Sequence, residues 1–362
     1  MVGRRSGERG VRVLHVNDAA FTTTNLIREA ARRGLPWRYL PIAVSDPAWS
    51  GVSGTVRRAA SGLRWEARLA RQAASCDLLH VHVASVVRHT GWVPRPYVLH
   101  LHGTDIRTHQ YLPEYSGLVR RAVERAAAVL YSTPDLAEHV RWRPDATLMP
   151  VPIDTGALPS WRPDPRPTVV FASRWEEVKG LAVQVRVADS LRRRRPTARL
   201  LGVDWGSGAD LARRHGVELV PRRSHDGFLE LLASAHVVVG QPTGMLAASE
   251  LEALGIGVPV VAALEPRWYP PALIPTPPVL GGLEIGRRHP LPTQDPSRAG
   301  ARELTGGEVE ATAEALAADV VNALDAPAAM MSVALGGPAW LARQHGVARA
   351  VDQLVDVYDR LR

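Results

Sequence analysis

The strongest constraint on the fold of this chain is an alternation of strand-like and helix-like segments that occurs twice along its length. Short apolar runs, typical of buried strands, are separated by longer segments whose apolar residues recur at helical spacing. In the first half, strands are predicted at 11–16, 37–44, 77–83, 97–103 and 128–133. Strands that are joined through helices pair in parallel, so this half predicts a doubly wound α/β domain.

A proline-rich interval at 149–168 interrupts the alternation, because it cannot form a regular element. The alternation then resumes, with strands predicted at 169–173, 198–203, 217–221, 236–241 and 259–263. An irregular segment rich in Pro and Gly is expected at 265–306, followed by helices near 308–325 and 338–361. This pattern predicts a second parallel sheet that is covered by helices.

The chain therefore predicts an α/β protein of two Rossmann-like, doubly wound domains that face each other across a cleft. We place the domains at 1–160 and 161–340, with a closing helical segment at 341–362. A length of 362 residues supports two domains, since single cores rarely grow beyond roughly 250–300 residues.

Composition narrows the classes of protein further. No apolar run approaches the roughly 20 residues of a membrane span, and no apolar signal core follows the basic start. The single cysteine, Cys76, excludes an intrachain disulfide and a cysteine-based zinc site. We expect a cytoplasmic protein, and we leave open a peripheral position on the inner face of the membrane.

The net charge of +8 suits an anionic partner, but it does not favour nucleic acid. The arginines are scattered through helices, and the sequence has neither zinc-finger spacing nor an aromatic RNA-binding strand. The basic amphipathic segment 55–75 fits either an anionic membrane surface or an ordinary solvated helix face.

A candidate anion site follows the first strand of the second half. Arg174 and Lys179 precede Gly180, at which a helix is expected to begin. Two cations beside a helix N-terminus attract negative charge, because free backbone N–H groups and the helix dipole both favour an anion. The alternative is that the two cations pair with Glu176 and Glu177 at the surface.

Two acids, Glu250 and Glu252, stand at a helix start in the same half, within the segment ASELEALGIGVPVVA at 248–262. Residues two positions apart on a helix point to different faces, so one of the two can face the strand ends. Only one of them can take that position, where it can accept hydrogen bonds from two neighbouring hydroxyls, and we expect the other to be solvated. The alternative, which suits Glu250, is the role of an N-terminal helix-dipole residue.

Several motifs together resemble GT-B glycosyltransferases of the glycosyltransferase 4-like family (glycosyl transferases group 1). In the second half they are R-x4-KG at 174–180, ELEALGIGVPVVA at 250–262 and the ending ARQHGVARAVDQLVDVYDRL at 342–361. In the first half DLLHVHV, LHLHGTDI, AAVLYSTPDLAEHV and MPVPIDT occur in the order that the family has. The resemblance covers nearly the whole chain. It implies the GT-B fold, with a donor-binding second domain and a last helix that crosses back to the first.

The resemblance also implies roles for individual residues. Arg174 and Lys179 match the pair that binds the donor diphosphate and stabilises charge on the leaving group, and Glu252 matches the glutamate that holds the nucleotide ribose. His102 matches a histidine near the transferred sugar, which gives it and the cation pair the catalytic roles. Gly180, Gly244 and Ser249 complete the predicted donor-binding set, and Asn17, Asp18 and Asp105 form the acceptor and sugar side. Asp105 either holds the histidine loop or contacts the acceptor.

Two departures from the family pattern bear on the substrate. The first glutamate of the E-x7-E signature, which contacts the sugar, falls on Gly244. The glycine pair after the first strand is replaced by Asn17 and Asp18. Both changes imply a reshaped or weaker site.

The resemblance implies a retaining transferase that moves a sugar from a nucleoside-diphosphate sugar to an acceptor hydroxyl, with no metal and no cofactor. The acceptor is a natural product, a polysaccharide or a lipid, and the oligomeric state is not predicted. Two alternatives stay open, a nucleotide-sugar epimerase or hydrolase and a catalytically weak partner protein that binds a nucleotide sugar. A dinucleotide dehydrogenase is rejected, because GVDWGSG at 202–208 lacks the G-x-G-x-x-G spacing.

Overall fold

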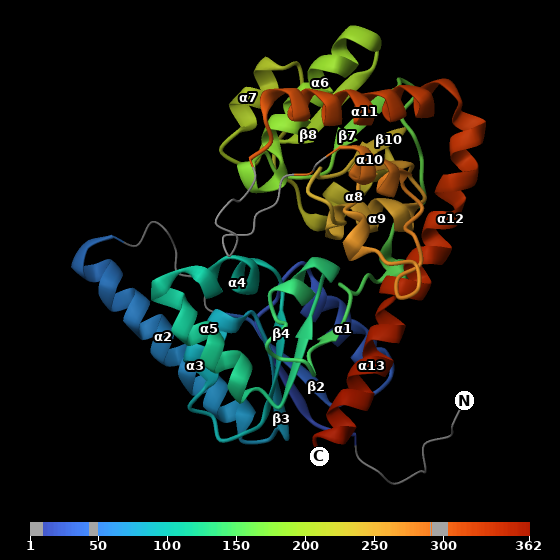
Figure 1. The fold of residues 1–362 in the computed structure, drawn as a ribbon. Coiled ribbons are helices and arrows are strands. Elements are labelled where there is room, and N and C mark those ends of the chain that lie inside the picture. The colour runs from blue at the N-terminus through green and yellow to red at the C-terminus, as the bar shows by residue number, and fades with distance from the viewer. Residues whose placement is uncertain (1–9, 43–49, 290, 292–302) are drawn as a thin grey trace. The chain divides into compact units, whose positions relative to one another are not determined.

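The computed structural model describes residues 10–42, 50–289, 291 and 303–362. The described chain divides into two compact units, of which unit 1 takes the chain up to Pro152 and again from Val347 to Arg362. Unit 2 is the continuous segment Ile153–Gly346. The boundaries thus fall at 152/153 and 346/347, where the sequence placed them at 160/161 and 340/341. Figure 1 shows both units as sheets with helices packed on them.

Unit 1 is built on a sheet in which every described strand pair is parallel. Its order is β2-β1-β3-β4-β5-β6. The strands are β1 (Val13–Val16), β2 (Trp37–Leu40), β3 (Leu78–His82), β4 (Tyr97–Leu101), β5 (Ala128–Tyr131) and β6 (Thr147–Leu148). Five of them lie within or overlap the strands predicted from the apolar runs. The short β6 at the edge is not predicted, since two residues carry no periodicity, and residues 43 and 44 of the strand predicted at 37–44 lie outside the described residues.

Helices cover both faces of this sheet, as a doubly wound fold requires. They are α1 (Thr22–Arg32), α2 (Gly51–Ala73), α3 (Val87–Thr90), α4 (Thr104–Arg107), α5 (Pro113–Arg125) and α13 (Val347–Arg360). One face packs against α2 and α5 through a core that includes Trp65, Leu69 and Val123. The other packs against α1 and α13 through Leu26 and Tyr358. Because strand side chains alternate between faces, residues two apart on β1, β3 and β4 meet the same helices.

Unit 2 is built on a second parallel sheet, with the order β12-β11-β10-β7-β8-β9. Its strands are β7 (Thr168–Phe171), β8 (Arg199–Val203), β9 (Glu218–Val220), β10 (Val237–Val239), β11 (Val260–Ala263) and β12 (Leu280–Gly281). Its helices are α6 (Leu181–Arg194), α7 (Ala209–Arg214), α8 (His225–Ala233), α9 (Ala248–Ile256), α10 (Gly282–Arg288), α11 (Gly306–Asp325) and α12 (Pro327–His345). Helix α11 packs on α6, and α12 packs on α9. The two sheets with their helices confirm the predicted α/β fold class.

Two expectations about the second half need correction. Residues 290 and 292–302 of the segment 265–306 lie outside the described residues, but its described part contains regular structure, because β12 adds an edge strand to β11 and leads directly into α10. Prolines at the ends of such short elements do not prevent them. The closing region holds three helices rather than two, since α12 precedes α13 and runs through Pro338.

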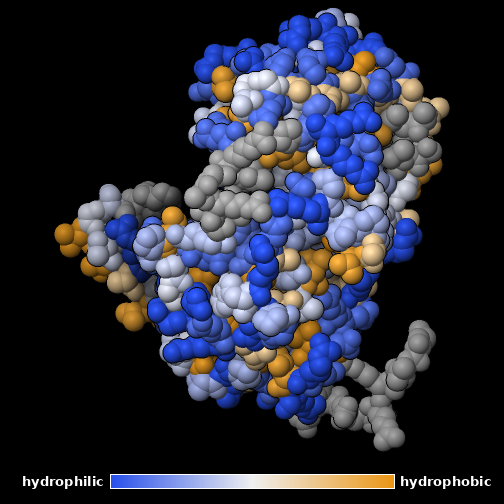
Figure 2. All heavy atoms as spheres, in the orientation of Figure 1, coloured by the Kyte–Doolittle hydropathy of each residue, from blue (hydrophilic) through white to orange (hydrophobic). Residues whose placement is uncertain are grey.

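Helix α2 is long, basic and only partly covered. Its buried residues include Trp65 and Leu69, whereas Val52, Val56 and Leu63 are exposed. Figure 2 shows hydrophobic residues gathered near the outer end of this helix. Within the described part of the chain, no helix combines the length and the apolarity that a membrane span needs.

Candidate functional site

The order of the strands in unit 2 fixes where a ligand site can form. Strands β8 and β9 lie on one side of β7, and β10, β11 and β12 lie on the other. The chain therefore reverses direction across the sheet between β7 and β10. Ligands of open α/β sheets bind beyond the carboxyl ends of the strands at such a switch point, because the two connecting loops part there and leave a crevice.

Lys179 spans this switch point. It lies between β7 and α6, and its Nζ donates to Oε1 of Gln241, just after β10, at 2.9 Å. Gly180 follows in the left-handed region at φ 72°, and a Cβ there would lie 2.7 Å from Pro242. Glycine is the residue that takes this conformation at such a close approach. Helix α6 then begins at Leu181, and its first N–H groups have no intrahelical partner.

Lys179 is the only lysine in the chain, although Lys and Arg together number 44. The two side chains differ chemically. An ammonium is a compact point charge with three donors, whereas a guanidinium is a planar fork. The half-buried ammonium of Lys179 is thus the single lysine charge of the protein, and it stands beside a helix N-terminus.

Arg174 lies on the other side of the same loop. Its guanidinium stacks over the ring of Trp205 at 5.0 Å and pairs with Oε1 of Glu176 at 3.1 Å. Arg222 also stacks over Trp205, at 4.4 Å. The surface ion pair that the sequence left as an alternative is therefore present for Arg174, yet the stacking also holds its charge at the carboxyl ends of β7 and β8.

The two acids of α9 have different roles, and one expectation is wrong. Glu250 is fully buried rather than solvated. Its carboxylate accepts hydrogen bonds from the backbone N–H of Gln241 at 2.7 Å, from that of Ala247 at 3.1 Å and from the hydroxyl of Ser249 at 3.0 Å. Glu250 therefore acts at the N-terminus of α9, which is the alternative that the sequence left for it, and it holds the β10–α9 loop in place. Ser249 is predicted to bind the donor, but its hydroxyl donates a hydrogen bond to this acid.

Glu252 is also buried, with 4% of its surface exposed. Its Oε1 lies 2.7 Å from Nε2 of His225, the first residue of α8. The acid predicted to hold a ribose is thus positioned by a histidine that stands just after β9. Sequence reasoning did not single out His225, because its partner is 27 residues away.

Gly244 has a local structural reason to be glycine. Its φ is 86°, and a Cβ there would lie 2.7 Å from the ring of Trp268 and 2.9 Å from Cβ of Glu265. Its carbonyl also accepts the N–H of Glu265 at 2.9 Å. A glutamate at 244 would therefore need the loop after β11 to move. The side chain of Glu265, which carries a carboxylate, begins beside the position that a Cβ of residue 244 would take.

In unit 1 the corresponding switch point lies between β1 and β3. Asn17 follows β1 with φ 73° and donates from Nδ2 to the carbonyl of His82 at the end of β3, at 3.2 Å. Val83, the next residue, has φ 75°. Positive φ is rare for residues other than glycine and costs roughly 1–3 kcal/mol, and such strain gathers at functional sites.

The backbone after β1 keeps a glycine-like shape without glycine. Ala20 and Phe21 have φ of 50° and 56°, and Phe21 is exposed. Asp18 accepts from the N–H of Thr23 at 2.9 Å and of Thr24 at 3.2 Å. Its carboxylate therefore occupies the helix N-terminus of α1, where an anion would otherwise bind.

Asp105 holds the loop after β4, which is the first of the two roles considered for it. Its buried carboxylate accepts from the N–H groups of Ala84 at 3.0 Å, His102 at 3.2 Å and Gly103 at 3.0 Å. Burial raises the pKa of Asp105, and these backbone hydrogen bonds oppose that shift. The side chain of His102 is half-buried at the carboxyl end of β4.

Five histidines of unit 1 share one face of its sheet: His15, His80, His82, His100 and His102. Burial lowers the pKa of His15 and of His100 to about 3 each. Burial also places the pKa of the other three well below the usual value. All five rings are therefore neutral at physiological pH.

Two histidine groups among the described residues bring three ring nitrogens within 4.8 Å of one another, one of His15, His80 and His82, and one of His82, His100 and His102. The rings of His80 and His82 lie parallel, at 4.3 Å and 4°. Nitrogen lone pairs lie in the ring plane, so stacked rings direct them side by side rather than toward one ion. The array favours contacts between rings, and the absence of a functional metal stays a prediction.

Several solved structures share this two-sheet architecture. The chain matches a structure of Anabaena Alr3699/HepE in complex with UDP and glucose, with a TM-score of 0.62, 15% identity and coverage of 96% of this chain and 99% of that one. It matches sucrose-phosphate synthase from Thermosynechococcus elongatus with a TM-score of 0.68, 14% identity and coverage of 97% and 99%. The fold is GT-B.

A third GT-B structure with the same extent of match is AviGT4, a glycosyltransferase involved in avilamycin A biosynthesis. The TM-score is 0.57 and the identity 19%, with coverage of 97% of this chain and 98% of that one. No family model matches the sequence, and no curated protein does either. At these identities the comparisons show the GT-B fold alone, so a proposal about activity has to be argued from the site residues.

Proposed function

We propose that this protein is a retaining, metal-independent glycosyltransferase that moves a sugar from a nucleoside-diphosphate sugar to an acceptor hydroxyl. The observation that carries the proposal is the contact between Lys179 and Gln241. It puts the only lysine of the chain beside the N-terminus of α6, at the switch point of the unit 2 sheet. That position combines an ammonium with the first backbone N–H groups of a helix, which is the chemistry that binds a diphosphate.

The remaining groups of unit 2 fit the rest of a nucleotide sugar. Arg174 offers a second cation for the diphosphate, Glu252 offers carboxylate oxygens for the ribose hydroxyls, and Ser249 supports Glu252's neighbour, Glu250. The HepE structures were determined with UDP and with UDP-glucose, and they share the fold over nearly the full chain. This likeness supports a nucleoside-diphosphate sugar as the donor.

The position of Gly244 suggests how the sugar is held. We propose that Glu265 supplies the carboxylate that residue 244 lacks, because its Cβ lies 2.9 Å from the place that a Cβ of residue 244 would take. The carboxylate of Glu265 is partly exposed and lies 3.5 Å from Nε of Arg267, so it can exchange that contact for a sugar hydroxyl.

In the proposed reaction the C1–O bond to the leaving phosphate breaks as the acceptor oxygen bonds to C1 on the same face of the sugar. The departing phosphate oxygen takes the acceptor proton, so atoms and charge balance without a protein base. Lys179, Arg174 and the α6 N–H groups stabilise the negative charge that develops on the diphosphate. We further propose that His102 hydrogen-bonds the transferred sugar and that Asn17 and Asp18 contact the acceptor.

Turnover of an isotope-labelled donor tests the proposal. Thermal shifts with UDP, GDP, ADP, CDP and TDP first identify the base, and the labelled sugar is then followed into acceptor, water or an epimer. Transfer with the anomeric configuration retained, undiminished by EDTA, is the expected result. Hydrolysis or epimerisation alone, or binding without turnover of any donor, would overturn it in favour of the two alternatives.

A peripheral membrane contact stays a prediction. It is supported by exposed Val52, Val56 and Leu63 on the arginine-rich helix α2. Sedimentation with vesicles of phosphatidylglycerol, and not of phosphatidylcholine, would favour a lipid acceptor. Failure to sediment with either would favour a soluble one.

A further inference from the structure

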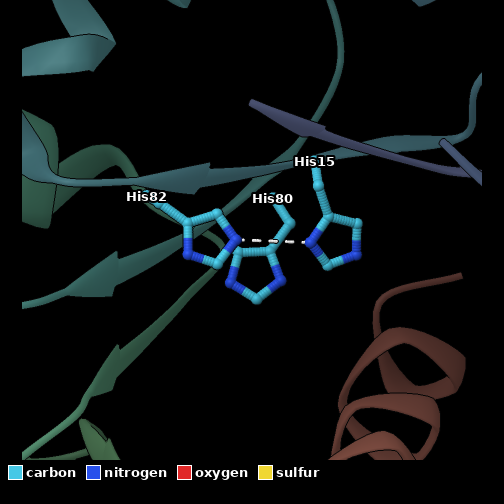
Figure 3. Close-up of side chains that lie close together, drawn as sticks. All are labelled: His15, His80 and His82. Atoms are coloured by element: carbon cyan, nitrogen blue, oxygen red, sulfur yellow. Dashed lines mark hydrogen bonds between the residues drawn. The ribbon is translucent and has the colours of Figure 1, made fainter. Parts of the chain in front are cut away.

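The stacked histidines of unit 1 form more than a packed core. His15 lies on β1, His80 and His82 on β3, and His100 and His102 on or just after β4. In the sheet register His15 is opposite His80, and His82 is opposite His100, so the rings form a continuous row beside α13. Figure 3 shows three of them, with the ring of His80 lying under the contact between His82 and His15.

Four contacts join members of this row into one hydrogen-bonded chain. Nε2 of His102 lies 3.0 Å from Nδ1 of His82. Nε2 of His82 lies 3.3 Å from Nδ1 of His15. Nε2 of His15 lies 3.4 Å from the hydroxyl of Tyr358 in α13, and that hydroxyl contacts Nδ1 of His80. The chain thus runs from half-buried His102 to Nε2 of His80, a buried nitrogen that has no hydrogen-bond partner among the described residues.

The chain can carry its protons in three orders, because each neutral ring donates on one side and accepts on the other, whereas the hydroxyl of Tyr358 can donate to either neighbour or accept from both. If Tyr358 accepts from both His15 and His80, its own O–H is buried and has no acceptor among the described residues. If every hydrogen points away from His102, Nε2 of His80 carries an N–H that is buried and has no acceptor. If every hydrogen points toward His102, that nitrogen keeps only a bare lone pair.

The order in which every hydrogen points toward His102 is the most stable of the three. The other two leave a buried N–H or O–H without an acceptor, which is rarer and costs more than a buried acceptor without a donor. The hydrogen then lies on Nδ1 of His82 and points at Nε2 of His102. Because His102 is neutral, its own hydrogen lies on Nδ1, at the half-buried end of the chain.

We propose that His82 is a positioning residue that fixes His102 as the Nδ1–H tautomer, so that His102 presents a hydrogen-bond donor to the transferred sugar. This inference rests on the proposed function for the identity of the group that receives the hydrogen bond. His15 and Tyr358 continue the chain and supply the donor that Nε2 of His82 needs. An Nδ1–H directed at a sugar hydroxyl holds the transferred sugar in the orientation in which the C1–O bond breaks and the acceptor bonds to C1.

Two-bond 1H–15N correlation spectra of protein labelled at histidine test the inference directly, because the shifts of the two ring nitrogens distinguish the tautomers. The His102 signals are assigned by their loss in His102→Gln. The expected result is an Nδ1–H tautomer for His102 in the wild-type protein. An Nε2–H tautomer would overturn the proposal whatever the enzyme does.

Two variants on the same strand form a matched pair. His82→Phe keeps an aromatic ring but removes the donor, so His102 should populate both tautomers. His80→Phe removes the neighbouring ring of the stack, which lies 4.3 Å away, but leaves the hydroxyl of Tyr358 to donate to His15. His102 should therefore keep the Nδ1–H tautomer in His80→Phe. A change of equal size in both variants would show a packing effect and overturn the inference.

Activity provides the second readout. His82→Phe should lower kcat about tenfold, with the nucleotide Kd unchanged, because one hydrogen bond of the transition state is lost. His82→Asn, whose amide N–H can replace Nδ1–H, should restore both the tautomer and most of kcat. Should the wild-type protein turn over no donor, the proposed function fails, while the tautomer spectra still decide the role of His82.

Discussion

Oε1 of Glu252 lies 2.7 Å from Nε2 of His225, so the acid predicted to hold the ribose is oriented by the first residue of another helix. The same helix α9 carries Glu250, whose oxygens accept three hydrogen bonds from its own loop. Two acids two residues apart thus have different partners, because one pairs with a histidine of another helix and the other is held by the N–H groups and the hydroxyl of its own loop.

Replacement of the two acids should separate binding from stability. Glu252→Gln should weaken nucleoside diphosphate binding at least tenfold, because hydrogen bonds to a charged carboxylate contribute roughly 1.5–3 kcal/mol. Its melting temperature should change little. Glu250→Gln should instead lower the free energy of unfolding by about 1–3 kcal/mol. The reason is that one of the two accepting oxygens becomes an NH2 group, which would then face the donors that the carboxylate now satisfies. Calorimetric titration and thermal melts measure the two effects, and equal nucleotide affinity in wild type and Glu252→Gln would exclude the ribose role.

Lys179→Ala should lower kcat by roughly 100-fold, which corresponds to about 3 kcal/mol of lost stabilisation of the leaving diphosphate. Lys179→Arg keeps the charge but changes its shape, so it should recover only part of the loss. A near-normal kcat in Lys179→Ala would assign the lysine to the surface contact with Gln241 alone.

The single lysine also permits a chemical test. Reductive methylation can modify only Lys179 and the chain's amino terminus, so mass spectrometry of the peptide that contains residue 179 reports its accessibility. A bound nucleoside diphosphate should protect Lys179 and leave the terminal amine reactive. Equal modification with and without the nucleotide would contradict the diphosphate site.

Glu265→Gln should raise the KM for the sugar donor severalfold and leave the affinity for the free nucleoside diphosphate unchanged. The reason is that Glu265 is proposed to contact the sugar and not the nucleotide. Gly244→Ala serves as the structural comparison, because φ 86° and the contact with Trp268 should cost it roughly 1–2 kcal/mol of stability. Donor kinetics in Glu265→Gln that match the wild type would remove Glu265 from the sugar site.

The buried histidines predict a steep loss of stability in acid. Their pKa in the folded protein is lowered by burial, to about 3 for His15 and His100, from an ordinary value of 6.5. Between those values the unfolded chain binds more protons than the folded one, so the free energy of unfolding falls as the pH drops below 6.5 and is fully present above it. Five such groups give a slope of up to about 7 kcal/mol per pH unit.

A domain stabilised by about 5–15 kcal/mol should therefore unfold within one to two pH units below 6.5. Circular dichroism against pH, with potentiometric proton uptake, measures the transition. His80→Phe, which has one histidine fewer to protonate, should reduce the slope by about 1.4 kcal/mol per pH unit. Retention of the fold to pH 4, with the histidines taking up protons near their ordinary pKa of 6.5, would show that they titrate in the folded protein and would contradict this prediction.

The sequence by itself determined the alternating elements of both sheets, because strands that are buried on both faces leave short continuous apolar runs and amphipathic helices leave a periodicity of 3.6 residues. It also placed Arg174, Lys179 and Glu252 after strand ends, where a parallel sheet collects ligands. It could not separate the roles of Glu250 and Glu252, since that depends on which N–H groups the folded β10–α9 loop turns toward each carboxylate.

Only the tertiary structure showed that His225 meets Glu252, that Trp205 stacks between Arg174 and Arg222, and that Tyr358 completes the histidine chain 278 residues after His80. A period-2 recurrence of histidine in HVH and HLH was visible along the chain, but the register that aligns those strands was not. Contacts between distant segments arise from sheet order and helix packing, which no local pattern of residues encodes.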